Sequence, residues 1–172
     1  MASLMEDLIS ILESENEAYG RLLSLSMAKT PVIISADLDA LGKITDDEQE
    51  IVNQINALDR KRSESMKDIA IVINKDVNTL KLTDLIEMLK SRPTEQNRLA
   101  AVYDNLVDTL GQMRRINEQN RELINESLEM IQFDMNVLQA YKAAPETANY
   151  TGNAYSAGMY MGENKGGFDA KQ

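Results

Sequence analysis

The stretch that decides the fold is residues 93–141, PTEQNRLAAVYDNLVDTLGQMRRINEQNRELINESLEMIQFDMNVLQAY. Its apolar residues follow one another in alternating steps of three and four, as they do along the seam of a coiled coil. Pro93 suits the first turn of a helix, and at ~1.5 Å per residue a helix from Pro93 to Tyr141 is about 70 Å long. The seam consists of Leu99, Val102, Leu106, Leu110, Met113, Asn117, Asn120, Ile124, Leu128, Ile131, Met135 and Leu138.

Three shorter segments with helical spacing precede this one. Apolar residues recur at helical spacing over residues 4–25 and again over residues 38–73. A short helix is expected over Asp84–Lys90, with Thr83 as its N-cap. A helix of the length predicted for residues 93–141 does not fit a compact globule. We therefore predict an all-α fold, an elongated antiparallel three-helix bundle or coiled coil in which the first two helices pack along the long C-terminal one.

The path of the chain around Pro31 stays open at this point. Thr30 could cap a new turn with Pro31 at its first position, or the first helix could kink and continue to about Ser35. Ser35 and Asp37 are both good N-cap residues for the second helix.

Composition excludes several classes of function. The chain has 172 residues and a formal net charge of −10, which argues against nucleic acid as the main partner. His and Cys are absent, so neither a thiolate zinc site nor a His-based catalytic triad can be built. No signal peptide and no run of ~18 apolar residues is present, which predicts a cytoplasmic protein without membrane insertion.

We expect neither an enzyme nor a cofactor or metal. No Gly-rich phosphate loop, nucleophile elbow or distinct carboxylate pair occurs. The acidic cluster Asp46, Asp47, Glu48 and Glu50 lacks the alternating ligands and glycine of a calcium loop. A solvated helix face is the simpler interpretation of this cluster.

The C-terminal segment differs from the rest of the chain. Residues 145–172 contain no Leu, Ile or Val, but they hold five of the eight glycines and the tyrosines Tyr150, Tyr155 and Tyr160. Such a composition cannot bury enough apolar surface to offset the entropy of ordering. We expect a helical domain over residues 1–144 and a disordered tail over 145–172, whose tyrosines are either recognition elements or part of a solubilising segment.

The second half of the long helix carries more apolar residues than one seam requires. A second stripe recurs at seven-residue spacing about 100° from the seam. It consists of Ile116, Leu123, Met130 and Val137, and Tyr141, four residues further on, extends the same line. Either the helix contacts two neighbours of its own bundle, or this stripe receives the amphipathic helix of a partner. In the second case it would be a large exposed apolar patch.

Two asparagines occupy seam positions of the long helix. A polar seam residue commonly fixes register or oligomeric state. The alternative, which we favour slightly, is that the bundle is splayed at Asn117 and Asn120 and that both amides are hydrated.

Several segments resemble the FlgN family of flagellar export chaperones, which serve type III protein export. They are LISILESE (8–15), DLDAL (37–41), LDRKR (58–62), NEQN (117–120) and NYTG (149–152). The order and spacing of these segments carry the resemblance, which covers residues 4–155.

The resemblance implies a cytoplasmic chaperone that binds hook-associated proteins, prevents their premature assembly and delivers them to the flagellar export gate. It places the partner-binding residues on the last helix, and we assign Ile116, Asn120, Leu123, Met130, Val137 and Tyr141. Tyr150 is the counterpart of the family's gate-docking tyrosine. The alternatives are a structural coiled-coil protein that forms a homodimer and has no client, and, ranked last, a metal-dependent enzyme using the acidic cluster.

Overall fold

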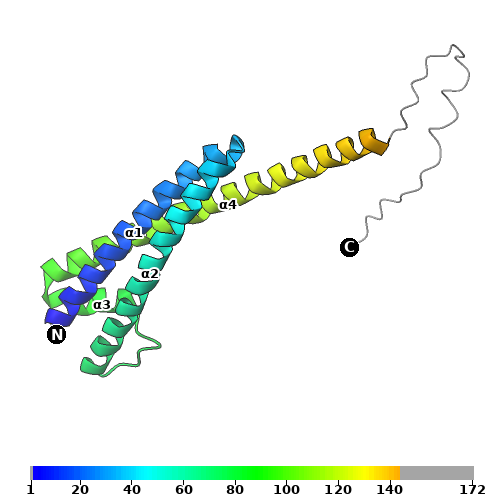
Figure 1. The fold of residues 1–172 in the computed structure, drawn as a ribbon. Coiled ribbons are helices and arrows are strands. Elements are labelled where there is room, and N and C mark those ends of the chain that lie inside the picture. The colour runs from blue at the N-terminus through cyan, green and yellow to red at the C-terminus, as the bar shows by residue number, and fades with distance from the viewer. Residues whose placement is uncertain (1, 144–172) are drawn as a thin grey trace, which may run out of the picture. The chain divides into compact units, whose positions relative to one another are not determined.

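The computed structural model describes residues 2–143, which are almost entirely helical and contain no strand (Figure 1). The predicted all-α class and the long C-terminal helix are confirmed. The expected tail, with Tyr150, Tyr155 and Tyr160, lies outside the described residues. The elements are α1 (Ala2–Ile34), α2 (Leu38–Val72), α3 (Leu82–Met88), the 3₁₀ helix η1 (Leu89–Ser91) and α4 (Pro93–Ala143).

The chain divides into two compact units, residues 1–134 and residues 135–172. The first unit holds α1, α2, α3, η1 and most of α4. The second unit, so far as it is described, holds the last turns of α4, residues 135–143.

Side-chain contacts define the direction of each long helix in the first unit. Arg98, near the start of α4, donates to Glu6 of α1 at 2.7 Å. Asn120, 22 positions further along α4, reaches Ser26 of α1. Helices α1 and α4 therefore run parallel. Helix α2 runs opposite to α1, and Arg21 of α1 accordingly donates to Gln54 of α2 at 2.7 Å.

Two hydrophobic clusters hold the first unit together. The larger one joins the N-terminal half of α1, the end of α2, the α3 region and the start of α4. Its most completely buried members are Leu8, Ile9, Leu12, Ile69, Leu85 and Leu99. The smaller one packs Ala18 and Leu22 of α1 against Ile51 and Ile55 of α2. The stripes expected in the first three segments supply most of these residues.

Helix α1 continues through Pro31 and ends at Ile34. Pro31 lies in the last turn, so the one hydrogen bond that it cannot donate, to the carbonyl of Met27, is lost close to the end of the helix. Beyond it, Ala36 adopts a left-handed conformation with φ 54°, and its N–H donates to Ile33 O at 3.1 Å. The N–H of Asp37 donates to Val32 O at 3.3 Å, which completes a Schellman motif.

The start of α2 follows directly from this turn. The Asp37 carboxylate accepts from Ala40 N–H at 3.0 Å, so Asp37 is the N-cap that the sequence offered. Leu38, the first residue of the predicted apolar stripe, is 78% exposed because it lies at the turn, beyond both clusters.

Helix α3 begins before the predicted boundary. It starts at Leu82, not at Asp84, so Thr83 lies inside it and is not its cap. The Asp84 carboxylate accepts from the backbone N–H of Lys81 at 2.9 Å, which stabilises this earlier start. The predicted end at Lys90 falls within η1, and α4 begins at Pro93 as expected.

Candidate partner-binding face of the last helix

The register between α1 and α4 determines which part of α4 is covered in the first unit. Paired residues of the two helices are separated by 85 to 94 positions. Since α1 ends at Ile34, it reaches α4 only to about residue 125. Asn120 is the last buried residue of α4 among those described.

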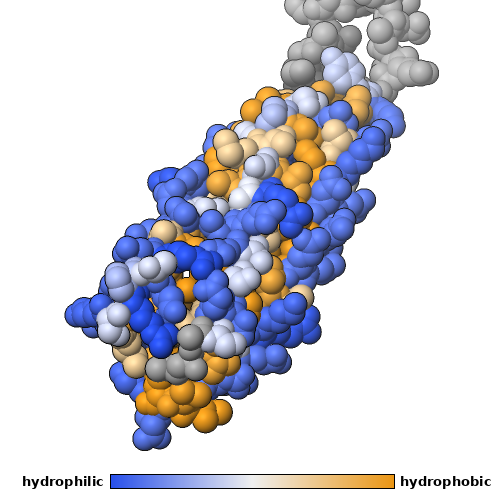
Figure 2. Space-filling view, turned by 90° about the vertical axis from the view of Figure 1, so that its left-hand side faces the viewer, coloured by the Kyte–Doolittle hydropathy of each residue, from blue (hydrophilic) through white to orange (hydrophobic). Residues whose placement is uncertain are grey.

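Beyond that point, the first unit exposes large apolar side chains along α4. Their exposed fractions are Ile124 37%, Leu128 58%, Met130 68%, Ile131 54% and Phe133 66%. Large apolar side chains in such a density are unusual on a surface that has no partner. Figure 2 shows hydrophobic side chains exposed between bands of hydrophilic ones on the face that it displays.

The predicted packing of the whole seam against the first two helices is therefore wrong for Ile124, Leu128 and Ile131. Leu99, Val102 and Leu106 are buried as the seam requires. Further along α4 the helix that should cover the seam has ended, so identical spacing leaves the side chains exposed.

The exposure of the second stripe changes along its length. In the first unit, Ile116 and Leu123 are half-buried and Met130 is exposed. In the second unit, Val137 is 37% exposed and Tyr141 is 79% exposed. Among the described residues, Met130, Val137 and Tyr141 are thus exposed, while Ile116 and Leu123 are partly covered.

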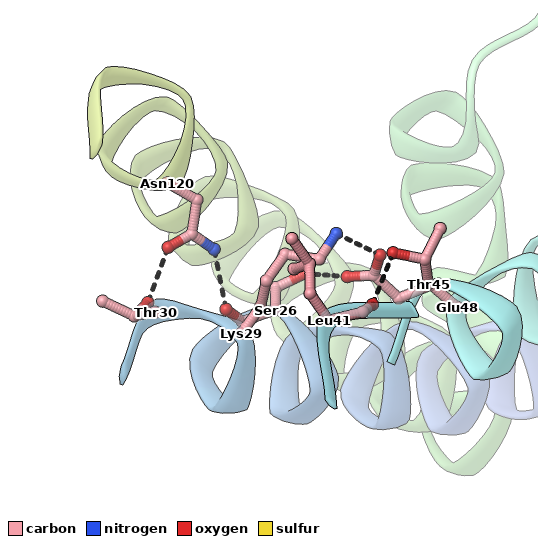
Figure 3. A network of polar contacts seen from close by, with 7 residues as sticks. All are labelled: Ser26, Lys29, Thr30, Leu41, Thr45, Glu48 and Asn120. Atoms are coloured by element: carbon pink, nitrogen blue, oxygen red, sulfur yellow. Dashed lines mark hydrogen bonds and ion pairs between the residues drawn. The ribbon is translucent and has the colours of Figure 1, made fainter. Parts of the chain in front are cut away.

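Asn120 is buried and fully engaged by α1 (Figure 3). It is 4% exposed, its Nδ2 donates to Ser26 O at 2.8 Å, and its Oδ1 accepts from Thr30 Oγ1 at 2.7 Å. The interpretation of hydrated amides is wrong for Asn120, although Asn117 is exposed. Because both ends of the Asn120 amide are bonded, a shift of α4 along α1 would leave a buried polar group unpaired.

A second polar contact joins α1 to α2 beside Asn120. Lys29 forms an ion pair with Glu48, and Ser26 Oγ donates to Glu48 Oε1 at 3.4 Å (Figure 3). Ser26 and Thr30 are not among the residues predicted from the sequence. The signal that could have identified them is their four-residue spacing from Leu22, which places small hydroxyl side chains on the buried stripe of α1.

A cleft of about 410 Å³ opens where these three helices meet. Apolar side chains from each helix, Leu22, Val52 and Met113, form part of its lining. Its polar lining includes Asn117 and Arg121 of α4. Ile124 belongs both to this cleft and to the exposed apolar series, so the two surfaces are continuous.

A separate polar group divides the two hydrophobic clusters. The Glu15 side chain, 5% exposed, accepts from Arg62 Nε at 3.0 Å, and Arg62 also pairs with Asp59. Burial raises the pKa of Glu15 above its ordinary value, and the charge of Arg62 opposes this shift. Burial, with the charge of Glu15, also raises the pKa of Tyr19. Nearby Ser65 Oγ is buried without a hydrogen-bond partner among the described residues.

The acidic cluster on α2 does not converge on a site. Asp46, Asp47 and Glu50 are exposed, and Glu48 pairs with Lys29. Within residues 2–143, no group of three or more acidic side chains is placed to hold a metal ion. No helix in the described part of the chain is long and apolar enough to cross a membrane.

Comparison with known proteins identifies relatives. The family model described as FlgN protein matches residues 1–157. The chain is 26% identical over 120 residues to the uncharacterized protein YvyG of Bacillus subtilis (strain 168), and the match covers 70% of this chain and 71% of YvyG. No solved structure matches.

Proposed function

The chain belongs to the FlgN family of flagellar export chaperones, and we propose that its clients are hook-associated proteins, bound through an amphipathic segment near their C-termini. The observation that carries this proposal is the exposed apolar series on α4 between Ile124 and Phe133. A helix that presents apolar side chains without an intramolecular neighbour can pair with the apolar face of another helix.

Each proposed contact residue has a place in this scheme. Met130 provides the most exposed contact of the series, and its flexible thioether adapts to different client side chains. Ile116 and Leu123 border the interface where the bundle ends. Val137 and Tyr141 offer further apolar surface on the last turns of α4.

Asn120 has a positioning role in the same scheme. Its amide is committed to Ser26 and Thr30, so it fixes how far α4 extends past α1. The stretch of α4 that extends beyond the end of α1 then sets how long a client helix can pack against α4.

The proposed mechanism is reversible occupation of this face. A client segment that is unfolded before assembly gains a helical partner on α4, so its apolar side chains are unavailable for premature assembly with other subunits. Ile124, Leu128 and Ile131 share one side of α4, and burying their exposed parts contributes roughly 3 kcal/mol from this chain, before the entropic cost of association. Such an energy scale permits release at the export gate. Tyr150, proposed for gate docking, lies outside the described residues.

The proposal predicts that Met130→Asp abolishes binding of a client's C-terminal segment in a calorimetric titration. A carboxylate in a desolvated helix contact loses hydration without gaining a partner. Helical content by circular dichroism should stay at the wild-type level, because Met130 is 68% exposed. Val107→Asp is the matched control, since Val107 is 54% exposed on the same helix. Wild-type affinity in Met130→Asp would contradict the proposal.

Self-association through the same face is the second candidate. The heptad-like spacing of Ile124, Leu128 and Ile131 favours it, because such a seam also suits a coiled-coil dimer. Sedimentation of the full chain distinguishes the two. A tight dimer that ignores hook-associated proteins would support the structural coiled coil, whereas a chain that self-associates weakly and binds the client supports the chaperone.

A further inference from the structure

The charge on α4 changes sign next to the cleft. Arg114, Arg115 and Arg121 lie on α4 at or before the cleft, and Lys29 faces it from α1. From residue 122 to residue 134, by contrast, α4 carries four acidic and no basic side chains. In a chain of net charge −10, this concentration of positive charge is a local exception.

The acidic partners near the cleft do not cancel this excess. Glu118 reaches Arg121 only at 3.7 Å, and both side chains are more than half exposed, so the pair is weak. Lys29 and Glu48 pair with each other and their charges cancel, so the three arginines of α4 near the cleft carry the positive excess. Arg114 and Arg115 remain exposed on the surface of α4.

The cleft also offers an apolar place for the end of a helix. Its volume of about 410 Å³ exceeds the ~150 Å³ that holds one benzene-sized group, so it can take two side chains one helical turn apart. Ile124 belongs both to the cleft and to the exposed apolar series. A helix that packs on α4 can therefore extend into the cleft without interruption.

We infer that the client helix lies antiparallel to α4, with its carboxyl end in the cleft between α1, α2 and α4. This inference rests on the proposed function. The last four carbonyl groups of a helix lack intrahelical donors. Together with a terminal carboxylate, these carbonyl groups concentrate negative charge at the carboxyl end of the helix. Asn117 and Arg121 supply donors at the cleft. Asp134, three residues after Ile131 and four after Met130 on the same side of α4, favours the positive amino end of the client helix.

The reverse orientation meets charges of the wrong sign at both ends. An amino end in the cleft would lie beside Arg121, and a carboxyl end further along α4 would lie beside Asp134. Like charges brought together at an interface disfavour that orientation. The charge pattern therefore selects direction, while the apolar series supplies affinity.

The test compares two forms of one client peptide, the C-terminal amphipathic segment of a hook-associated protein with a free carboxylate or with a carboxamide. In titrations of the full chain, the amide should bind about three- to tenfold more weakly. Arg121→Gln should weaken binding of the carboxylate peptide until its affinity equals that of the carboxamide peptide. The affinity of the carboxamide peptide itself should stay unchanged. Arg60→Gln is the matched control, because Arg60 is exposed on α2 and donates to its own helix at Asn56 O.

A photoreactive phenylalanine analogue at position 117 reports direction independently. It should cross-link to the last residues of the peptide. Cross-links to its first residues, or equal binding of acid and amide by the wild-type chain, would overturn the orientation and leave the proposed function intact. Failure of a folded wild-type chain to bind either peptide would overturn the proposed function and this inference together.

Discussion

At the scale of single residues, Asn120 illustrates how one polar group can define a binding surface that it does not form. Its amide spans α1 and α4, with one bond to a backbone carbonyl and one to a side-chain hydroxyl. A Leu at this seam position would pack, but it would accept several registers. The bonded amide selects the register in which Asn120 is the last buried residue of α4 among those described.

Asn120→Ala should lower the free energy of unfolding by about 1–3 kcal/mol, because it leaves Thr30 without its acceptor and opens a void. Urea denaturation measures the change. Asn117→Ala, at an exposed position of the same helix, should change stability by no more than about 0.5 kcal/mol. Equal effects of the two substitutions would show that the buried amide does not fix the register.

Glu15 yields a prediction about pH. A carboxyl whose pKa is raised in the folded chain holds its proton more tightly there than in the unfolded chain. Its stabilising contribution is fully present below pH 4.5, its ordinary pKa, and is lost as the pH rises through the raised value. Glu15→Gln does not titrate, so the stability of wild type relative to this variant should increase as the pH falls from neutral toward 4.5.

Urea denaturation of both chains across this pH range tests the sign, because the other carboxylates are common to both and cancel. A relative stability that decreases with falling pH would mean that the pair with Arg62 outweighs burial and that the pKa of Glu15 is lowered.

At the scale of the elements, the ends of the helices follow local chemistry. The α1–α2 turn requires a left-handed residue, and the sequence provides Ala36 there. The end of α2 uses the same motif with Asn74, a residue that tolerates this conformation better.

Ala36→Gly should therefore stabilise the chain by about 0.5–1 kcal/mol, since glycine removes the steric cost of the left-handed conformation. Thermal denaturation measures the effect. Ala57→Gly, at an exposed position inside α2, should destabilise by a similar amount. Destabilisation by Ala36→Gly would contradict the described turn.

The sequence predicted these elements well where the signal was local. Pro93 and the regular spacing after Leu99 gave the start and length of α4, and Asp37 gave the start of α2. The prediction of Thr83 as the N-cap of α3 was wrong, because the Asp84 carboxylate accepts from the Lys81 N–H and stabilises an earlier start of the helix.

At the scale of the whole molecule, the two described units have to be considered one by one. The first unit is built from the two hydrophobic clusters and the polar groups between and beyond them. The exposed series Ile124–Phe133 belongs to this unit and lies past its last buried residue. Among the described residues, the exposure of this part of α4 is thus a consequence of where α1 ends.

This exposure could not be predicted from the sequence alone. Spacing shows that Leu106 and Leu128 both belong to one seam, but not that α1 covers the first and stops before the second. Register between helices depends on contacts between residues about 90 positions apart, such as Thr30 with Asn120. The second stripe placed the candidate site on the last helix as a prediction, whereas the cleft at Ser26 and Glu48 required the assembled structure.

We predict that a client segment occupies the part of α4 that α1 leaves uncovered. Amide hydrogen exchange of the full chain, with and without the C-terminal segment of a hook-associated protein, tests it most directly. Protection should increase over residues 121–134, while α1 and α2 far from the cleft keep their exchange rates, because helix pairing suppresses local opening. Protection confined to α1 and α2, with residues 121–134 exchanging as in the free chain, would contradict the account.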